Sequence, residues 1–162
     1  MLKDKRAYCF EGAVFAAAAL AYQGQRPLLI DLRTTDDDRD EDHVVAPFTV
    51  DGLWGAISKT NYPVLRWRDP VYKTIRELVM SYFHEYYLSK DGSKTLVAYS
   101  KPFSLARYKP ELWVTAENSL DWLAEALDDS PHYPIAPQKA LKKTRAASAF
   151  ERKATDAREW KK

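Results

Sequence analysis

The chain is short of several residue types, and each shortage removes a class of protein. It has 162 residues and one cysteine, so it forms no internal disulfide and we expect it in a reducing cytoplasm. Three scattered histidines and that single cysteine give no metal-ligand cluster, so we expect no zinc or other metal site. Five glycines lie far apart, which excludes a glycine-rich phosphate loop, and we expect no cofactor.

Long apolar runs and a strong net charge are also missing. No uncharged apolar stretch reaches the length that spans a membrane, and the charged start lacks a convincing cleavage site, so we expect neither a membrane segment nor a secretory signal. A formal net charge of +2 commits the protein to neither nucleic acid nor a membrane surface. With 46% hydrophobic residues, the chain predicts one domain over residues 1–137 and a basic, helix-prone tail over 138–162.

The first third of the chain predicts a helix and then a strand. Residues 9–22 form an apolar run typical of a buried helix, and Gly24 is placed to cap its C-terminus. A short apolar run over 26–32 predicts a buried strand. The polar, acidic residues 33–42 that follow predict a loop.

A hairpin follows that loop. Asp51-Gly52 is a strong turn signal between two apolar runs, so residues 43–50 and 53–58 predict paired strands with Val50 facing Leu53. Pro47 predicts a bulge in this pairing. Further along, Pro70 predicts the start of a helix that runs through Leu88, with Asp69 as its N-cap.

Cys9 stands where a reactive cysteine would stand, at the beginning of the predicted apolar helix. A helix N-terminus carries partial positive charge and unpaired N–H groups, and both favour the thiolate, which is the nucleophilic form. The alternative is that Cys9 fills space in the core, since cysteine is among the most buried residue types. His43, the first residue of the predicted hairpin, is the candidate base.

The order of these features resembles the transglutaminase-like superfamily of papain-type thiol enzymes, in a bacterial branch. The matching pieces are Cys9 at a helix start, Gly24 with Arg26 after that helix, His43 on a strand, and Trp54 in the return strand of the hairpin. The resemblance covers residues 6–60. It implies an α+β fold in which the N-terminal helix carrying the cysteine packs on a small antiparallel sheet with a hairpin, accompanied by further helices.

The resemblance also implies a chemistry. Cys9 would be the nucleophile that attacks an acyl carbon of a peptide or amide substrate and forms a thioester, and His43 would be the base. The backbone N–H of Cys9 would be one oxyanion donor. Water would complete a hydrolysis, as in an amidase or peptidase, and an amine would complete a transamidation.

The family's third catalytic residue is an aspartate at the end of the return strand, and this chain departs from that pattern. The corresponding place falls near Ser58, which is not acidic. The candidates within reach are Asn61, since asparagine orients the histidine in papain-type enzymes, and Asp69, which keeps the charge. Asp42 adjoins His43, but successive side chains of a strand point to opposite faces, so it is not placed to orient the ring.

Two other functions stay open at this point. The missing acid and the eight residues before Cys9 fit a catalytically inactive member of the same fold that serves as a binding module. The aromatic and basic segment 62–72, together with the tail, fits a protein that binds a partner. A nucleic-acid partner is not expected, because the sequence shows no nucleic-acid-binding fold.

Overall fold

The computed structural model describes residues 7–35 and 40–159 as an α+β fold built on one antiparallel sheet, which confirms the predicted fold class. The sheet order is β4-β3-β2-β1-β5-β7, and the short β6 also pairs with β1. The strands are β1 (Leu28–Arg33), β2 (His43–Val50), β3 (Leu53–Ile57), β4 (Trp67–Tyr72), β5 (Ala98–Ser100), β6 (Phe103–Ser104) and β7 (His132–Pro134). The helices are α1 (Cys9–Tyr22), α2 (Ile75–Phe83), α3 (Asp121–Asp128), α4 (Gln138–Leu141) and α5 (Ala149–Arg152).

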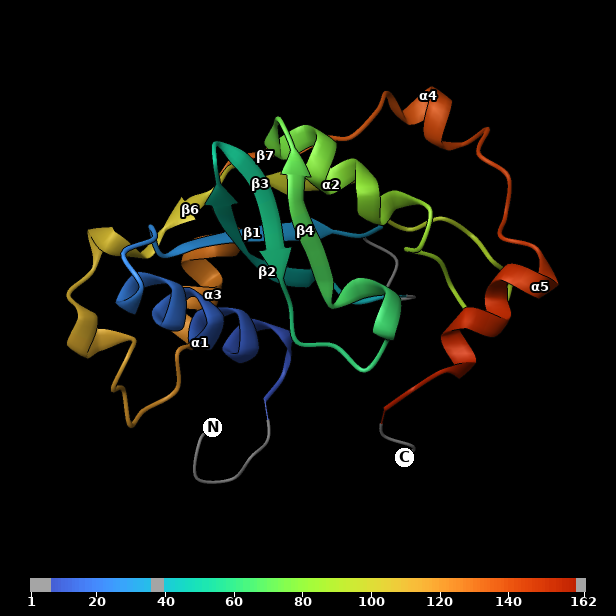
Figure 1. Cartoon of the computed structure of the whole chain (residues 1–162). Helices are drawn as coiled ribbons and strands as arrows, with labels where there is room; N and C mark the ends of the chain where they lie inside the picture. The colour runs from blue at the N-terminus through green and yellow to red at the C-terminus, as the bar shows by residue number, and fades with distance from the viewer. Residues whose placement is uncertain (1–6, 36–39, 160–162) are drawn as a thin grey trace.

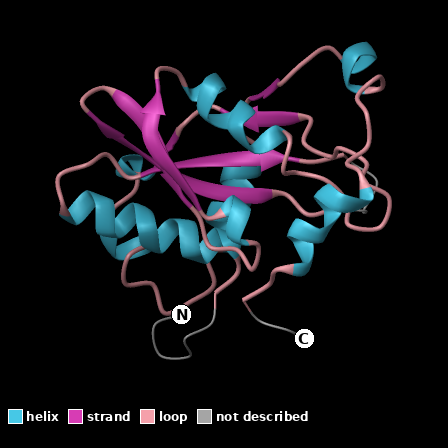
Figure 2. Ribbon diagram, turned by 45° about the vertical axis from the view of Figure 1, so that its right-hand side comes forward, coloured by secondary structure: helices cyan, strands magenta, loops and turns pink. Residues whose placement is uncertain are grey.

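Helices cover both faces of the sheet, so the core has two layers (Figures 1 and 2). On one face, α1 and α3 pack against alternate strand residues that include Leu29, Val44 and Ala46. On the other face, α2 packs against the intervening residues, among them Ile30 and Val45. This alternation follows from the two-residue period of a strand, and it decides on which face each side chain near the start of β2 lies.

The predicted first helix forms with the predicted bounds. The carboxylate of Glu11 accepts the N–H of Tyr8, which satisfies one of the free donors at the helix start. At the other end, Gly24 adopts a φ of 83°, and the N–H groups of Gly24 and Gln25 donate to the carbonyls of Ala21 and Leu20. This pattern is the Schellman motif, in which glycine is favoured because it has no Cβ.

The hairpin also forms as predicted, with one correction. Asp51 and Gly52 have φ values of 51° and 79°, as a two-residue type I′ turn requires, and Val50 pairs with Leu53. The predicted bulge at Pro47 is wrong, because the register runs without a shift from Val50 to Ala46. The irregularity lies on the other side of β3, where its pairing with β4 shifts between Trp54 and Ala56.

The prediction of a helix over residues 70–88 with Asp69 as its N-cap is wrong. Residues Trp67–Tyr72 form β4, the edge strand of the sheet, where the missing N–H of Pro70 is tolerated. The helix is the shorter α2, and it begins after Thr74, whose hydroxyl accepts the N–H of Glu77 in a capping box. Asp69 instead accepts a hydrogen bond of 2.8 Å from the indole of Trp67.

The segment after β7 folds back over the α2 side of the molecule. The N–H of Ala147 donates to the carbonyl of Gly92 at 2.8 Å, and the hydroxyl of Tyr87 donates to the carbonyl of Glu151 at 2.6 Å. Near the end of the described chain, Glu159 forms an ion pair with Arg66. Among the described residues, no helix is both long enough and apolar enough to cross a membrane.

Candidate active site

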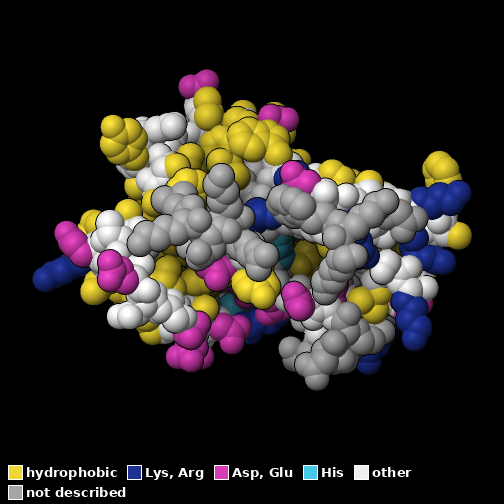
Figure 3. Space-filling model, turned by 90° about the horizontal axis from the view of Figure 1, so that it is seen from below, with side chains coloured by type: hydrophobic (Ala, Val, Ile, Leu, Met, Phe, Trp, Pro, Cys, Tyr) yellow, Lys and Arg dark blue, Asp and Glu magenta, His cyan; other side chains and the backbone are white. Residues whose placement is uncertain are grey.

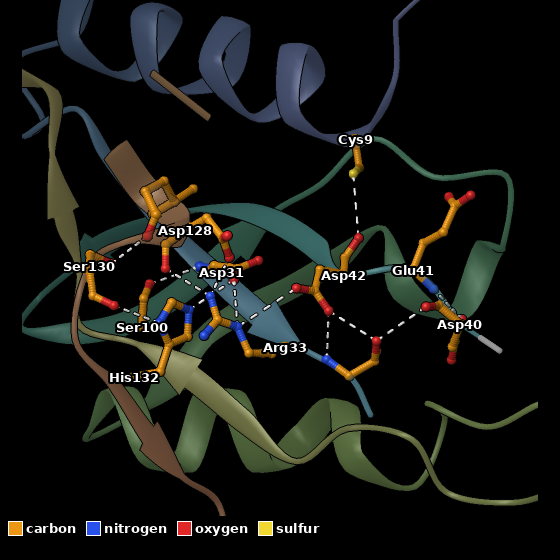
Figure 4. Close-up of polar contacts among 12 residues, drawn as sticks. Cys9, Asp31, Arg33, Asp40, Glu41, Asp42, Ser100, Asp128, Ser130 and His132 are labelled. Carbon is orange, nitrogen blue, oxygen red and sulfur yellow. Dashed lines mark hydrogen bonds and ion pairs between the residues drawn. The ribbon is translucent and has the colours of Figure 1, made fainter. Parts of the chain in front are cut away.

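Cys9 is the first residue of α1, and its sulfur lies against the chain on both sides of His43 (Figure 4). The thiol donates to the carbonyl oxygen of Asp42 at 3.8 Å, and the backbone N–H of Val44 also faces the sulfur. The tertiary fold therefore brings Cys9 next to a residue that is 34 positions away in the sequence. The proximity is to the backbone around His43, because the His43 ring lies beside Tyr86 on the opposite face of the sheet.

The pKa of the Cys9 thiol is raised above its usual value, contrary to the expectation from its helix position. Burial is the largest cause, and the negative charges of Asp31 and Glu41 add to it. The backbone N–H groups of Val44 and Phe10 act in the other direction, because they stabilise the thiolate. The favourable field of the helix start is thus outweighed by desolvation, and the resting sulfur is a neutral thiol.

The imidazole of His43 is buried on the α2 face of the sheet. It shares the strand parity of Val45, it is 5% exposed, and its ring centroid lies 6.5 Å from that of Tyr86. Its Nε2 atom is buried without a hydrogen-bond partner among the described residues. Burial lowers the pKa of His43 to about 4, so the ring is neutral at neutral pH. Cys9 and His43 are therefore both uncharged at rest.

Two of the three candidates for the third residue, Ser58 and Asp69, make side-chain contacts away from His43, and Asn61 contacts Glu159 through its backbone. The hydroxyl of Ser58 donates to the carbonyl of Leu65 at 2.6 Å, and Asp69 is bound by the indole of Trp67. The carbonyl of Asn61 accepts the N–H of Glu159 at 3.3 Å, just beyond the end of β3. Within the described part of the chain, none of these contacts orients the imidazole of His43.

A buried acid–histidine pair that sequence reasoning missed lies on the Cys9 side of the sheet. Nε2 of His132 on β7 lies 2.9 Å from Oδ2 of Asp31 on β1, and its Nδ1 lies 2.6 Å from the carbonyl oxygen of Ser130. Because a carbonyl only accepts, Nδ1 carries a proton, and the other contact needs a proton on either Asp31 or Nε2. Burial raises the pKa of Asp31 to about 6, while the hydrogen bond from His132 lowers it.

Three carboxylates surround one guanidinium beside this pair (Figure 4). Nε of Arg33 lies 3.9 Å from Asp31 and 3.8 Å from Asp42, and its Nη2 forms an ion pair with Asp128. The carboxylate oxygens lie within 4.8 Å of one another, a spacing that would also suit a cation, and the guanidinium already supplies positive charge there. In the view from below, acidic side chains gather around recessed histidine side chains (Figure 3).

One sequence signal pointed to this cluster. Asp31 is the single charged residue inside the apolar run Leu28–Leu32, and a carboxylate in a buried strand needs a partner. The partner itself gave no signal, since His132 lies in a proline-rich segment 101 positions away.

The comparisons with known proteins add no family to this picture. No protein-family model matches the chain, and a search of curated proteins finds no match.

Proposed function

We propose that the protein is a cysteine-dependent acyl-transfer enzyme of the transglutaminase-like kind, an amidase, peptidase or transglutaminase, with Cys9 as nucleophile and His43 as base. One observation carries the proposal. The sulfur at the start of α1 lies against the backbone on both sides of His43. The resemblance of residues 6–60 to thiol enzymes supports the same two residues.

The chemistry proceeds from a neutral pair. The reaction requires the His43 imidazole, which lies on the α2 face at rest, to reach the Cys9 thiol and take its proton as the sulfur attacks the acyl carbon of a peptide or amide. The imidazolium then protonates the leaving amine, and a thioester remains on Cys9. Water or a second amine attacks that thioester, and Cys9 regains its proton.

Burial makes the charged pair costly in the free enzyme. Both the thiolate of Cys9 and the imidazolium of His43 are disfavoured by desolvation, as their pKa shifts show. The proton therefore moves during attack on a bound acyl group, where the developing oxyanion is stabilised by the backbone N–H of Cys9. This behaviour differs from that of a thiol enzyme with a preformed ion pair.

A binding module of the same fold is the second candidate. It is favoured by the neutral state of Cys9 and His43, by their placement on opposite faces of the sheet, and by the side-chain contacts of Ser58 and Asp69, which are directed elsewhere. A third candidate, partner binding through segment 62–72, is supported by Trp67, which is 50% exposed on the edge strand. Basic groups of that segment are neutralised by ion pairs of Arg66 with Glu159 and Arg68 with Glu85.

Turnover of peptide p-nitroanilides, with and without methylamine, separates these functions. An acyl-transfer enzyme releases p-nitroaniline, and the acyl product is the free acid for a hydrolase or the N-methyl amide for a transamidase. We expect Cys9→Ala to abolish turnover and His43→Ala to reduce it about 100-fold or more. His84→Ala is the matched control, because His84 is exposed at the end of α2. If the folded wild type shows no turnover, or if Cys9→Ala leaves the turnover unchanged, the result favours the binding module.

A further inference from the structure

We propose that Tyr86 is a positioning residue that holds the segment 40–42, and with it the Asp42 carbonyl, against Cys9, and that packs beside the His43 ring on the other face of the sheet. Its role in the reaction rests on the proposed function, whereas its effect on Cys9 and His43 does not. Tyr86 is 6% exposed, and its hydroxyl donates to the carbonyl of Glu41 at 2.9 Å across 45 residues of sequence.

Tyr86 and Cys9 hold two consecutive carbonyls from opposite faces of the sheet. The hydroxyl of Tyr86, in the core under α2, donates a hydrogen bond to the carbonyl of Glu41. The thiol of Cys9, at the start of α1, donates a hydrogen bond to the carbonyl of Asp42. The next residue is His43, whose ring lies beside the Tyr86 ring. Tyr86 therefore lies beside the His43 ring, and it is linked to Cys9 through the dipeptide Glu41-Asp42.

Thr95 also fixes this segment through hydrogen bonds. Its N–H donates to the carbonyl of Tyr86 at 3.4 Å, and its hydroxyl donates to Oδ2 of Asp40 at 2.5 Å. From the other side, the hydroxyl of Thr34 donates to the carbonyl of Asp40 at 3.3 Å, and the N–H of Thr34 donates to Asp42 at 2.7 Å. The entry to β2 is thus fixed on both sides by buried side chains.

The environment keeps Tyr86 a donor. Burial raises its pKa well above the usual value, and the negative charges of Asp40, Cys9, Asp42 and Asp31 raise it further. The hydroxyl therefore stays protonated over the whole range in which an acyl-transfer enzyme works, and the carbonyl of Glu41 keeps its partner.

Tyr86→Phe tests the proposal, with Tyr82→Phe as the matched control. Both are buried tyrosines, but the hydroxyl of Tyr82 has no hydrogen-bond partner within the described residues. Two readouts are followed: the pH dependence of Cys9 alkylation by iodoacetamide, and the NMR titration of His43. Loosening the segment admits water, so in Tyr86→Phe we expect the Cys9 pKa to fall and the His43 pKa to rise, each by about one unit. Tyr82→Phe should leave both values unchanged.

A second pair of variants covers the case in which Tyr86→Phe does not fold. Thr95→Val removes the hydroxyl that binds Asp40 and should shift both values in the same directions, whereas Thr95→Ser keeps the hydroxyl and should restore them. Unchanged values in folded Tyr86→Phe, or in Thr95→Val where Tyr86→Phe does not fold, overturn the proposal. If the two pKa values shift in the variants but the wild type shows no acyl transfer, the positioning role of Tyr86 stands and the proposed enzyme activity fails. If the wild type shows acyl transfer but the pKa values do not shift, the enzyme activity stands and the positioning role fails.

Discussion

The sulfur of Cys9 lies 3.8 Å from the carbonyl oxygen of Asp42, the residue that precedes His43. This contact makes the thiol a hydrogen-bond donor, and a donor thiol must carry its proton. Together with burial of both groups, the contact defines a resting site that is uncharged at Cys9 and His43.

Alkylation of Cys9 should be slow at neutral pH. Because burial raises the thiol pKa above its usual value, the iodoacetamide rate should keep increasing as the pH passes 9, with no plateau between pH 5 and 8. The rate is measured by mass spectrometry over this range, and unfolded protein in urea supplies the reference for an ordinary thiol. A fast, pH-independent rate at pH 6 would indicate a preformed ion pair and contradict the neutral site.

Stability should respond to pH through two buried groups of opposite sign. The His43 pKa is lowered from 6.5 to about 4 in the folded state, so its contribution is complete above pH 6.5 and is lost as the pH falls toward 4. The Asp31 pKa is raised from 3.8 to about 6, so its contribution is complete below pH 3.8 and is lost as the pH rises through 6. The two contributions have opposite signs and offset each other between pH 4 and 6.5.

Single variants should expose the two contributions separately. In Asp31→Asn, the free energy of unfolding should rise between pH 4 and 6.5, because only the His43 contribution remains in this window. In His43→Gln it should fall over the same window. Urea unfolding at half-unit intervals of pH measures both curves. Parallel curves for the two variants would mean that these groups do not have the shifted pKa values.

Gly12→Ala should destabilise the protein by about 1 to 2 kcal/mol and alter Cys9 reactivity. A Cβ at Gly12 would lie 2.2 Å from the Cβ of Lys59, so the first turn of α1 must move away from the chain after β3. That cost exceeds the gain of about 1 kcal/mol from helix propensity. Thermal unfolding and the alkylation rate are the measurements.

Gly24→Ala is the control at the other end of the same helix. Its φ of 83° disfavours alanine by about 1 kcal/mol, but a Cβ there would have no atom within 4 Å. It should therefore lower stability while leaving Cys9 alkylation unchanged. Equal alkylation rates in the two glycine variants would show that the reactivity of Cys9 does not depend on how the first turn of α1 packs.

Gly92→Ala should detach the segment around Ala147. The added Cβ would lie 2.3 Å from the carbonyl oxygen of Ala147, at the point where the two backbones share a hydrogen bond. Limited proteolysis should then cleave within residues 138–159 several-fold faster than in the wild type. Gly52→Ala has the same left-handed backbone with no contact within 4 Å, and it should not change that rate.

The start of the fold was predictable because its signals are local. The bounds of α1, the Gly24 cap and the Asp51-Gly52 turn follow from residue types that act over a few positions. The hairpin register follows from the turn, which places Val50 opposite Leu53 without any tertiary information. These elements carry both Cys9 and His43, but the His43 ring lies on the α2 face of the sheet and Cys9 on the α1 face.

The features that were missed depend on tertiary contacts. Pro70 marks a helix start when read alone, but a place at the edge of the sheet lets it lie in β4. The field of a helix N-terminus predicts a lowered pKa for Cys9, whereas burial in the folded chain raises that pKa. The sulfur also contacts the carbonyl of Asp42, which is 33 positions away in the sequence. The pairing of Asp31 with His132 spans 101 positions, and no local pattern announces it.

Single-turnover acylation tests the central claim most directly. Protein is mixed with excess p-nitrophenyl acetate, and the acetylated residue and its rate of formation are determined by mass spectrometry. The account predicts an acetyl thioester on Cys9 that forms about 100-fold more slowly in His43→Gln and at the wild-type rate in His84→Gln. Acetylation confined to other side chains, or a Cys9 rate that is the same in both histidine variants, would contradict it.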